Sequence, residues 1–384
     1  MYSQSSPTKD DQPPTNGTKS RNPTMQKVLL AFNSILMSVG NCGGPLILRL
    51  YFIHGGNRVW LSSWLFSGGW PIILIPLAIS YIHRRRTATA GSKTKLIFMR
   101  EPLLLFGSAV IGALTGLDNY LFAYGMARLP VSTSSLIIAS QLAFTAGFAY
   151  LLVKQKFTSY TVNSVVLLTM GGAILALHSS GDRPAGESNG EYIAGFLMTL
   201  GAAVLYGLIL PLIELMYKKT KQSLTYTLIL EIQLVMAISG TVLCTIGMLI
   251  NNDFQAIPRE GREFGLGNTK YYVVLVMSCV IWQCFFIGAV GVIFYSSSLF
   301  SGIVIALLLP AVEILAVIFF REKFQAEKGV SLALNLWGFV SYFYGEYKQT
   351  KKVKSIELQK AELGTTTPPP NQNSTRMDVD LQSY

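Results

Sequence analysis

Long runs of apolar residues, separated by short polar stretches, make up most of this chain. A helix that crosses a membrane needs about 20 mainly apolar residues, and ten runs meet that requirement. The pattern therefore predicts an all-α polytopic membrane protein with ten transmembrane helices. The predicted spans are Val28–Phe52, Val59–Ile82, Leu103–Met126, Ser132–Val153, Tyr160–Leu177, Tyr192–Met216, Tyr226–Ile250, Tyr271–Phe294, Leu299–Phe320 and Val330–Tyr347.

Two of these segments resemble each other in sequence. Residues Ser134–Phe157 and Ser301–Phe324 share seven identical positions at an offset of 167 residues. This offset equals five spans, an odd number, so the second copy is expected to be inserted upside down. Inverted repeats of this kind build two alternating gates around a site near the middle of the membrane. The expected units are a tail at 1–26, a five-helix repeat at 27–177, an outer loop at 178–191, a second five-helix repeat at 192–348 and a tail at 349–384.

Composition and charge agree with a membrane protein and set its orientation. Only 13% of the 384 residues are charged, against about 25% in a typical soluble protein. The net charge of +11 comes from short basic runs between apolar segments, not from one basic face, so we expect no nucleic-acid partner. With the N-terminus in the cytosol, 19 Lys and Arg up to Lys354 fall inside and nine fall outside. Both termini are therefore predicted to be cytosolic.

Four carboxylates fall within the predicted spans. Asp118 and Glu313 lie near the middle of their segments, where a charge is costly and usually functional. They are the candidates for proton coupling, with a buried structural hydrogen bond as the alternative. Glu214 and Glu231 lie nearer the cytosolic ends, where they could reach Lys218 or headgroup water, so an interfacial charge and a functional role fit equally well.

Uncharged polar and aromatic side chains are predicted at the same depth. Amides offer a donor and an acceptor side by side, which suits the edge of a nitrogen heterocycle, and aromatic rings offer a face for stacking. Each residue alone could equally serve helix packing, so only the collection favours a cavity. The candidate substrate-binding residues are Asn41, Asn119, Tyr124, Gln141, Gln233, Trp282, Gln283 and Glu313.

Helix-breaking residues occur inside three spans, in the stretches Asn41–Leu46, Gly69–Pro71 and Leu307–Pro310. Proline kinks a helix and leaves a carbonyl without its usual donor. Within a membrane this is tolerated only against protein or a water-filled cavity. The three stretches are therefore consistent with the wall of a cavity and equally with ordinary kinks that serve helix packing.

Several motifs are absent from the sequence. It has no Walker A sequence and no metalloprotease or serine-hydrolase pattern, so neither ATP nor an enzyme is indicated. The four cysteines lack metal-ligand spacing, and we expect no metal or cofactor. Arginines lie almost entirely in loops, which favours a neutral or cationic substrate over a phosphorylated one.

Three stretches resemble the plant purine permease family, a branch of the drug/metabolite transporter superfamily. They are "GLDNYLFAYGMARLPVSTSSLIIASQLAF", "IWQCFFIGAVG" and "REKFQAEKGVSLALNLWGFVSYFYGEYK", and the likeness extends from Val28 to Lys348. The resemblance implies the drug/metabolite transporter fold with two inverted five-helix repeats. It also implies proton-coupled uptake of adenine, cytokinins and purine alkaloids such as caffeine at the plasma membrane. Relatives that carry nicotine, benzylisoquinoline alkaloids or pyridoxine leave those substrates open.

A membrane receptor that binds such a ligand without moving it is the alternative from another class. The inverted repeat favours transport, because a receptor does not need two gates. The sequence leaves the oligomeric state open.

Overall fold

The computed structural model describes residues 23–87, 99–129, 131–155, 157–177, 189–320, 329–330, 333–345, 347–348, 351 and 355, and these residues are helices and short connections without a strand. The predicted tails and the loop at 178–191 lie almost entirely outside them. The helices are α1 (Pro23–Ile53), α2 (Val59–Ser67), α3 (Pro71–Thr87), α4 (Pro102–Arg128), α5 (Val131–Val153), α6 (Ser159–Leu177), α7 (Asn189–Lys219), α8 (Tyr226–Ile250), α9 (Asp253–Glu263), α10 (Asn268–Tyr295) and α11 (Ser298–Phe320). Residues 333–345 are also helical.

The prediction of an all-α membrane protein is confirmed. Six segments of the described chain are long and apolar enough to cross a membrane, with α2 and α3 counting as one segment. Eight of the predicted spans coincide with single helices, and the second is divided at residues 68–70 into α2 and α3. The predicted total of ten spans stays a prediction.

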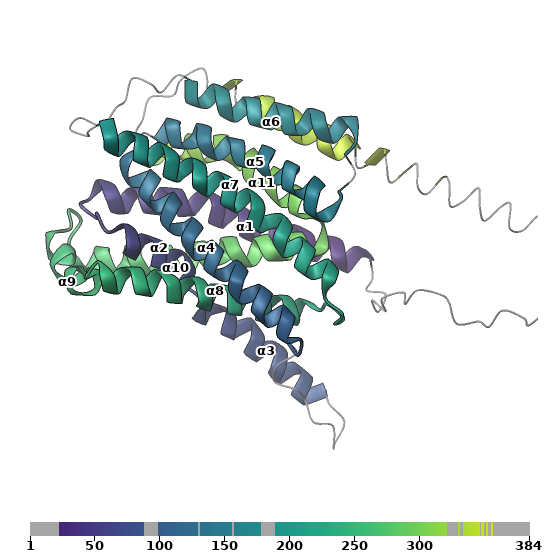
Figure 1. Cartoon of the computed structure of the whole chain (residues 1–384), viewed down its shortest axis with the longest axis horizontal. Coiled ribbons are helices and arrows are strands. Elements are labelled where there is room, and N and C mark those ends of the chain that lie inside the picture. Colours follow the sequence, from purple (N-terminus) through teal and green to yellow (C-terminus); the bar gives the residue numbers. More distant parts are fainter. Residues whose placement is uncertain are drawn as a thin grey trace, which may run out of the picture.

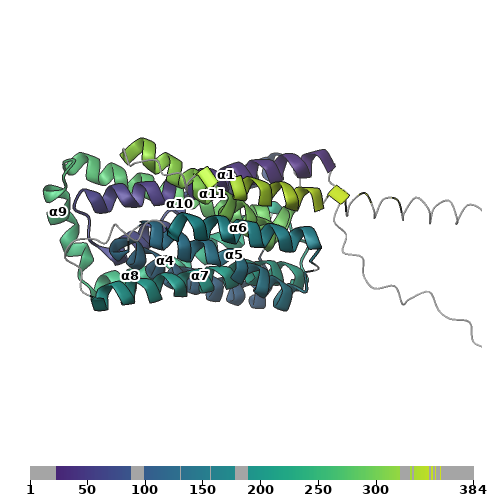
Figure 2. The same ribbon diagram turned by 90° about the horizontal axis from the view of Figure 1, so that it is seen from above.

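The helices form an elongated bundle with two distinct ends (Figures 1 and 2). α1 begins, and the last described helix ends, at the same end of the bundle, which we call the tail end. The short helix α9 lies at the opposite end, which we call the α9 end. The described chain therefore starts and finishes on one side.

Helix contacts occur in matched pairs. α1 packs along α10 as α4 packs along α7, α11 packs on α1 as α5 packs on α7, and α2 meets α10 as α8 meets α4. In this comparison, each helix corresponds to the helix that lies five predicted spans away in the sequence. Replacing both helices of one contact by their counterparts gives the other contact of the pair. Two related five-helix units would produce this pattern; the repeat layout and its limits stay predictions.

Glycine allows α1 and α10 to approach backbone to backbone. A Cβ atom on Gly40 would lie 2.4 Å from the backbone nitrogen of Phe285, and one on Gly288 would lie 2.4 Å from that of Met37. Small residues at helix contacts of membrane proteins permit this close packing. The close contact fixes the depth at which the two helices present their side chains.

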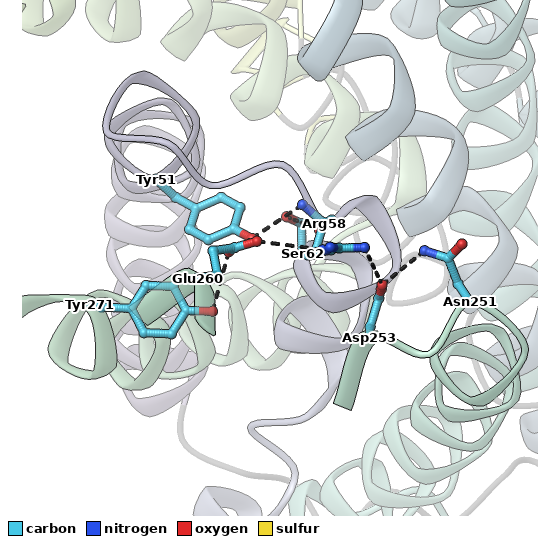
Figure 3. Close-up of polar contacts among 7 residues, drawn as sticks. All are labelled: Tyr51, Arg58, Ser62, Asn251, Asp253, Glu260 and Tyr271. Carbon is cyan, nitrogen blue, oxygen red and sulfur yellow. Dashed lines mark hydrogen bonds and ion pairs between the residues drawn. The ribbon is translucent and has the colours of Figure 1, made fainter. Parts of the chain in front are cut away.

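The α9 end is held by a buried polar cluster, shown in Figure 3. The guanidinium of Arg58 lies 3.6 Å from a carboxylate oxygen of Asp253 and 3.6 Å from one of Glu260. The hydroxyls of Tyr51 and Tyr271 both donate hydrogen bonds to Glu260. The cluster ties α9 to the α1–α2 corner and to α10.

Candidate functional site

A cavity of about 110 Å³ lies near the middle of the bundle. One water molecule needs about 10–15 Å³ of the same kind of volume. The cavity therefore has room for several waters or for a small planar ring system. Helices α1, α2, α4, α5, α7, α10 and α11 all contribute to its wall. The lining residues are Asn41, Pro45, Phe66, Asp118, Asn119, Phe122, Met126, Ile138, Gln141, Ala202, Ala203, Tyr206, Trp282, Phe285, Phe286, Ile305, Leu309 and Val312.

Three polar side chains of this wall have atoms that lack a hydrogen-bond partner within the described part of the chain. They are one carboxylate oxygen of Asp118, the amide nitrogen of Asn119 and the indole nitrogen of Trp282. All three residues are buried, and Asp118 is only 7% exposed. Buried polar groups are nearly always hydrogen-bonded in native proteins. One acceptor and two donors are therefore available around this cavity.

Aromatic rings form much of the remaining wall. The ring centroids of Trp282 and Phe66 lie 4.2 Å apart, so one face of the indole is already covered. Phe122 and Phe285 meet Trp282 edge-on, at 6.0 Å and 5.8 Å. On the α1 side, a Cβ on Gly44 would lie 2.8 Å from the indole ring, so only glycine fits there. Packing thus fixes the orientation of Trp282 and of its N–H group.

The kink residues of α1 also contribute to the wall. Pro45 has no N–H group, so it cannot donate the usual helical hydrogen bond to the carbonyl of Asn41, four residues earlier. The side chain of Asn41 lines the cavity and donates a long hydrogen bond, 3.5 Å, to the carbonyl of Ile305 in α11. Asn41 therefore presents both side-chain and main-chain polar groups at this depth.

Buried side chains lie on both sides of the cavity along the bundle. One or two turns nearer the tail end, α1, α7, α10 and α11 all carry fully buried side chains. These are Met37, Ile209, Leu210, Val292, Leu299 and Ser301. On the side of the α9 end, Leu48, Ala123 and Thr199 are buried in the same way, and the lining residues Met126, Leu309 and Val312 are half-buried.

Comparison with known proteins decides which family has this architecture. The family model described as purine nucleobase transmembrane transport matches residues 28–352. The chain belongs to this family of purine nucleobase transporters. Purine permease 3 of Arabidopsis thaliana is 54% identical over 88% of this chain and 96% of its own length. Purine permease 2 of the same plant is 51% identical over 89% of this chain and 98% of its own length.

A solved crystal structure shares the fold of the transporter. That protein is 13% identical, with a TM-score of 0.54 over 83% of this chain and 96% of the other. Family membership gives the transporter its general function, the movement of purine nucleobases across a membrane. The names of the relatives describe permeases, which are not enzymes.

Five of the polar and aromatic residues singled out from the sequence line the cavity together. They are Asn41, Asp118, Asn119, Gln141 and Trp282. They come from α1, α4, α5 and α10, so segments separated by up to about 240 residues of sequence meet here. Their role in binding stays a prediction.

The other candidates do not line this cavity, or their side chains are outside the described residues. The guanidinium of Arg128 lies 3.8 Å from the centroid of the Tyr124 ring, at the end of α4 and outside the cavity wall. Gln233 lines a second cavity of about 20 Å³, which shares Tyr206 and Phe286 with the first. Gln283 is fully buried and does not line the cavity. Glu313 belongs to α11, but its side chain is outside the described residues.

Tyr206 is the polar wall residue that the sequence did not single out. It comes from α7 and lines both cavities. The sequence could have indicated Tyr206, because a tyrosine lies there inside an apolar span at the depth of the other candidates. The phenylalanines of the wall gave no signal, because apolar aromatic residues occur throughout the spans.

Glu214 and Glu231 have protein partners. Glu214 accepts a hydrogen bond of 2.7 Å from the backbone N–H of Ser298 and pairs with Lys218 at 2.8 Å. Glu231 accepts one of 2.8 Å from the backbone N–H of Met99. Both carboxylates therefore join helix ends near the tail end, unlike Asp118 in the middle of α4.

Proposed function

We propose that this transporter takes up purine bases and related nitrogen heterocycles, including cytokinins and purine alkaloids such as caffeine, together with a proton across the plasma membrane. One observation carries the proposal. The unpaired polar atoms of Asp118, Asn119 and Trp282 belong to the wall of one aromatic cavity in the middle of the membrane-spanning bundle. Such a wall suits a flat ligand with alternating donors and acceptors along its edge.

The purine ring supplies the missing partners. Its ring nitrogens accept from the amide nitrogen of Asn119 and the indole N–H of Trp282, and its amino or ring N–H donates to Asp118. Asn41 and Gln141 complete the polar wall, and Tyr206 lies beside them. Because one face of Trp282 is covered by Phe66, the indole acts through its N–H, while Phe122, Phe285 and Phe286 provide apolar contact with the ring.

Asp118 couples the proton to the substrate. An ionised carboxylate without a partner at this depth costs at least a few kcal/mol, so a proton or a protonated ring nitrogen neutralises it during the cycle. A membrane potential of 100 mV contributes about 2.3 kcal/mol per charge moved, which supports a gradient of tens-fold. Glu313 is the second candidate for this role.

Alternating access follows from the same layout. With both termini in the cytosol, the α9 end faces outward, and the buried residues between the cavity and the tail end would form the inner gate. The matched helix contacts support two related repeats, and if these are inverted, an exchange of conformation between them would open the two ends of the bundle in turn. Substrate and proton would then be released into the cytosol.

The test is uptake of labelled adenine by a cell that lacks its own purine carrier, with cytokinin, caffeine, nicotine, pyridoxine and papaverine as competitors. Asp118→Asn keeps the side chain's shape and removes its charge. At matched surface expression, we expect loss of accumulation against a gradient and loss of the dependence on outside pH. Exchange of labelled for unlabelled substrate is expected to survive. Glu263→Gln, which changes an exposed carboxylate of α9, serves as the control and should leave uptake unchanged.

Two outcomes contradict the proposal in different ways. If Asp118→Asn still concentrates adenine and a protonophore still abolishes that gradient, the proton binds elsewhere, and Glu313→Gln is the next variant. If wild-type protein binds adenine but never concentrates it in the cell, the proposal of active uptake is wrong.

A further inference from the structure

The smaller cavity, of about 20 Å³, lies beside the central one and is enclosed by α2, α4, α7, α8 and α10. Tyr206 and Phe286 line both cavities, so these two side chains lie between them. Since one water molecule needs about 10–15 Å³, the smaller cavity has room for one water and not for a purine. Most of its wall is apolar, and its polar residues are Ser67, Thr115, Tyr206 and Gln233.

The smaller cavity lies on the tail-end side of the central one. α4 and α8 begin, and α7 ends, at the tail end (Figure 1). Along α4, Thr115 of the smaller cavity precedes Asp118 of the central cavity, and along α7, Ile213 of the smaller cavity follows Tyr206. Gln233 belongs to the first half of α8. The smaller cavity therefore lies between the central site and the side that is predicted to be cytosolic.

The polar groups of its wall match what a buried water requires. Gln233 is only 2% exposed, and its side-chain carbonyl oxygen lacks a hydrogen-bond partner within the described part of the chain. Thr115 donates its hydroxyl to the carbonyl of Ile111 at 2.8 Å, so its oxygen can still accept. A water here could donate to Gln233 and Thr115 and accept from Tyr206. These are about three hydrogen bonds, the usual number for a buried water.

Tyr206 connects this cavity with Asp118. The two side chains line the central cavity together and are close enough to interact electrostatically. A phenol oxygen can accept a hydrogen bond while its own O–H donates one, so a tyrosine can pass a proton on without a lasting charge. The order along the bundle is Asp118, Tyr206, the smaller cavity and then the tail end.

We propose that the smaller cavity binds one water molecule between Gln233 and Tyr206, and that the proton leaves Asp118 toward the tail end through this water. The second half rests on the proposed proton coupling by Asp118. The carboxyl group gives its proton to the phenol oxygen of Tyr206, and the phenol gives its own hydrogen to the water. The water passes one proton to cytosolic water once the tail end has opened. Asp118 is left ionised, Tyr206 and the water are unchanged, and Gln233 acts as a positioning residue.

The water itself is tested by an experimental structure of the full-length transporter at a resolution that shows ordered water. We expect one water within hydrogen-bond distance, about 2.7–3.2 Å, of the carbonyl oxygen of Gln233 and of the hydroxyl of Tyr206. Gln233→Met keeps the length of the side chain and removes its polar groups, so this variant should lose the water. Absence of the water from wild-type protein at that resolution would overturn the proposal.

The proton path is tested with purified transporter in liposomes that contain a pH-sensitive dye. At saturating adenine, we expect Gln233→Met to slow adenine-driven proton entry at least about tenfold, because no positioned water accepts the proton. Exchange of labelled for unlabelled adenine should stay close to wild type, because exchange does not require the proton to leave Asp118. Gln233→Glu keeps an acceptor oxygen at the same place and should recover much of the rate.

A double-mutant cycle tests whether Gln233 and Tyr206 act through the same water. Tyr206→Phe removes only the hydroxyl. If this change and Gln233→Met each slow proton entry about tenfold, the double variant should also lose about tenfold and not about a hundredfold, because effects within one hydrogen-bond network are not additive. Thr241→Val, in the same helix as Gln233, is the control. Thr241 lines neither cavity and donates its hydroxyl to the carbonyl of Ala237, so proton entry should stay unchanged.

Two transport results would overturn the path. Equal slowing of proton entry and of exchange by Gln233→Met would mean that the variant impairs the whole carrier. Multiplied effects in the double variant would mean that Gln233 and Tyr206 act independently. If wild-type protein carries adenine without any proton entry, the proposed coupling by Asp118 is wrong and the path falls with it, whereas the structure still decides the water site.

Discussion

At the scale of single residues, the partner of each buried carboxylate distinguishes its role. Glu214 and Glu231 accept backbone N–H groups at helix ends, which is a structural use. One oxygen of Asp118 lacks a partner within the described residues, and it shares a cavity wall with unpaired donors of Asn119 and Trp282. The sequence separates these carboxylates by depth alone, with Asp118 near the middle of its segment and Glu214 and Glu231 nearer the ends. Their surroundings single out Asp118.

Gly44 tests the packing that orients Trp282. A Cβ there would lie 2.8 Å from the indole, and Phe66 blocks the ring from moving away. We expect Gly44→Ala to destabilise the protein by about 1–3 kcal/mol and to weaken purine binding severalfold, measured by thermal unfolding and by competition for labelled adenine. Gly147→Ala is the control, since nothing lies within 4 Å of its added Cβ. Equal behaviour of the two variants would mean that Gly44 does not position Trp282.

At the scale of elements, two features depart from ten straight helices. The second predicted span is divided into α2 and α3, where the stretch Gly69–Pro71 had predicted a kink. The helix α9 was not predicted at all, because its 11 residues are too few and too polar for a membrane span. It begins after Asn252, which adopts a left-handed conformation with φ of 55°, one that asparagine tolerates better than most residues. Tertiary contacts hold α9 in place.

Arg58 should be essential to the anchoring of α9. Asp253 is fully buried and Glu260 nearly so, so Arg58→Gln leaves two buried carboxylates without a cation. We expect a loss of about 3 kcal/mol in the free energy of unfolding, seen as a lower unfolding temperature. Glu260→Gln in the same chain should restore part of it. Arg262→Gln, at an exposed position of α9, should have little effect.

The loss caused by Arg58→Gln should depend on pH. Burial raises the pKa of Asp253 above its usual value, and Asn251 and Arg58 oppose that rise. Removing Arg58 raises this pKa further, so acid protonates Asp253 more readily in the folded variant. The deficit against wild type is therefore expected to be largest at neutral pH and to shrink as pH falls through the raised pKa. A deficit that grows in acid would contradict this account of the cluster.

At the scale of the whole molecule, orientation decides what the two ends of the bundle mean. Both ends of the described chain lie at the tail end (Figures 1 and 2), as an even number of crossings requires. The distribution of Lys and Arg predicts that this end is cytosolic. If so, α9 and its polar cluster lie on the outer side of the membrane.

Thiol labelling tests the orientation directly. In a background without the four native cysteines, Glu263→Cys places a thiol at the α9 end and Lys219→Cys places one at the tail end, both at exposed positions. A membrane-impermeant maleimide should label only Glu263→Cys on intact cells and both variants after permeabilisation. The sequons at Asn16 and Asn373 should also stay unmodified. The reverse labelling pattern, or a mobility shift on deglycosylation, would invert the topology.

Much of the transporter can be deduced from its sequence for a simple physical reason. In hydrocarbon, a chain must satisfy its backbone hydrogen bonds within each span, so apolar runs of sufficient length identify helices such as α4, α7, α8 and α10 before any contact is known. Polar groups are costly to bury in the same hydrocarbon, which marks Asp118, Asn119, Gln141 and Trp282 as candidates. The three quoted stretches of sequence indicate the family.

Only the tertiary structure decided which candidates meet. Asn41, Asp118, Gln141 and Trp282 lie on four helices, and periodicity in a nearly all-apolar span does not reveal which face turns inward. Gln283 and Tyr124 do not line the cavity, whereas Tyr206 does. The stretch Gly69–Pro71 predicted a kink in the second span, but only the tertiary structure shows that α3 leaves the bundle there and packs chiefly on α8.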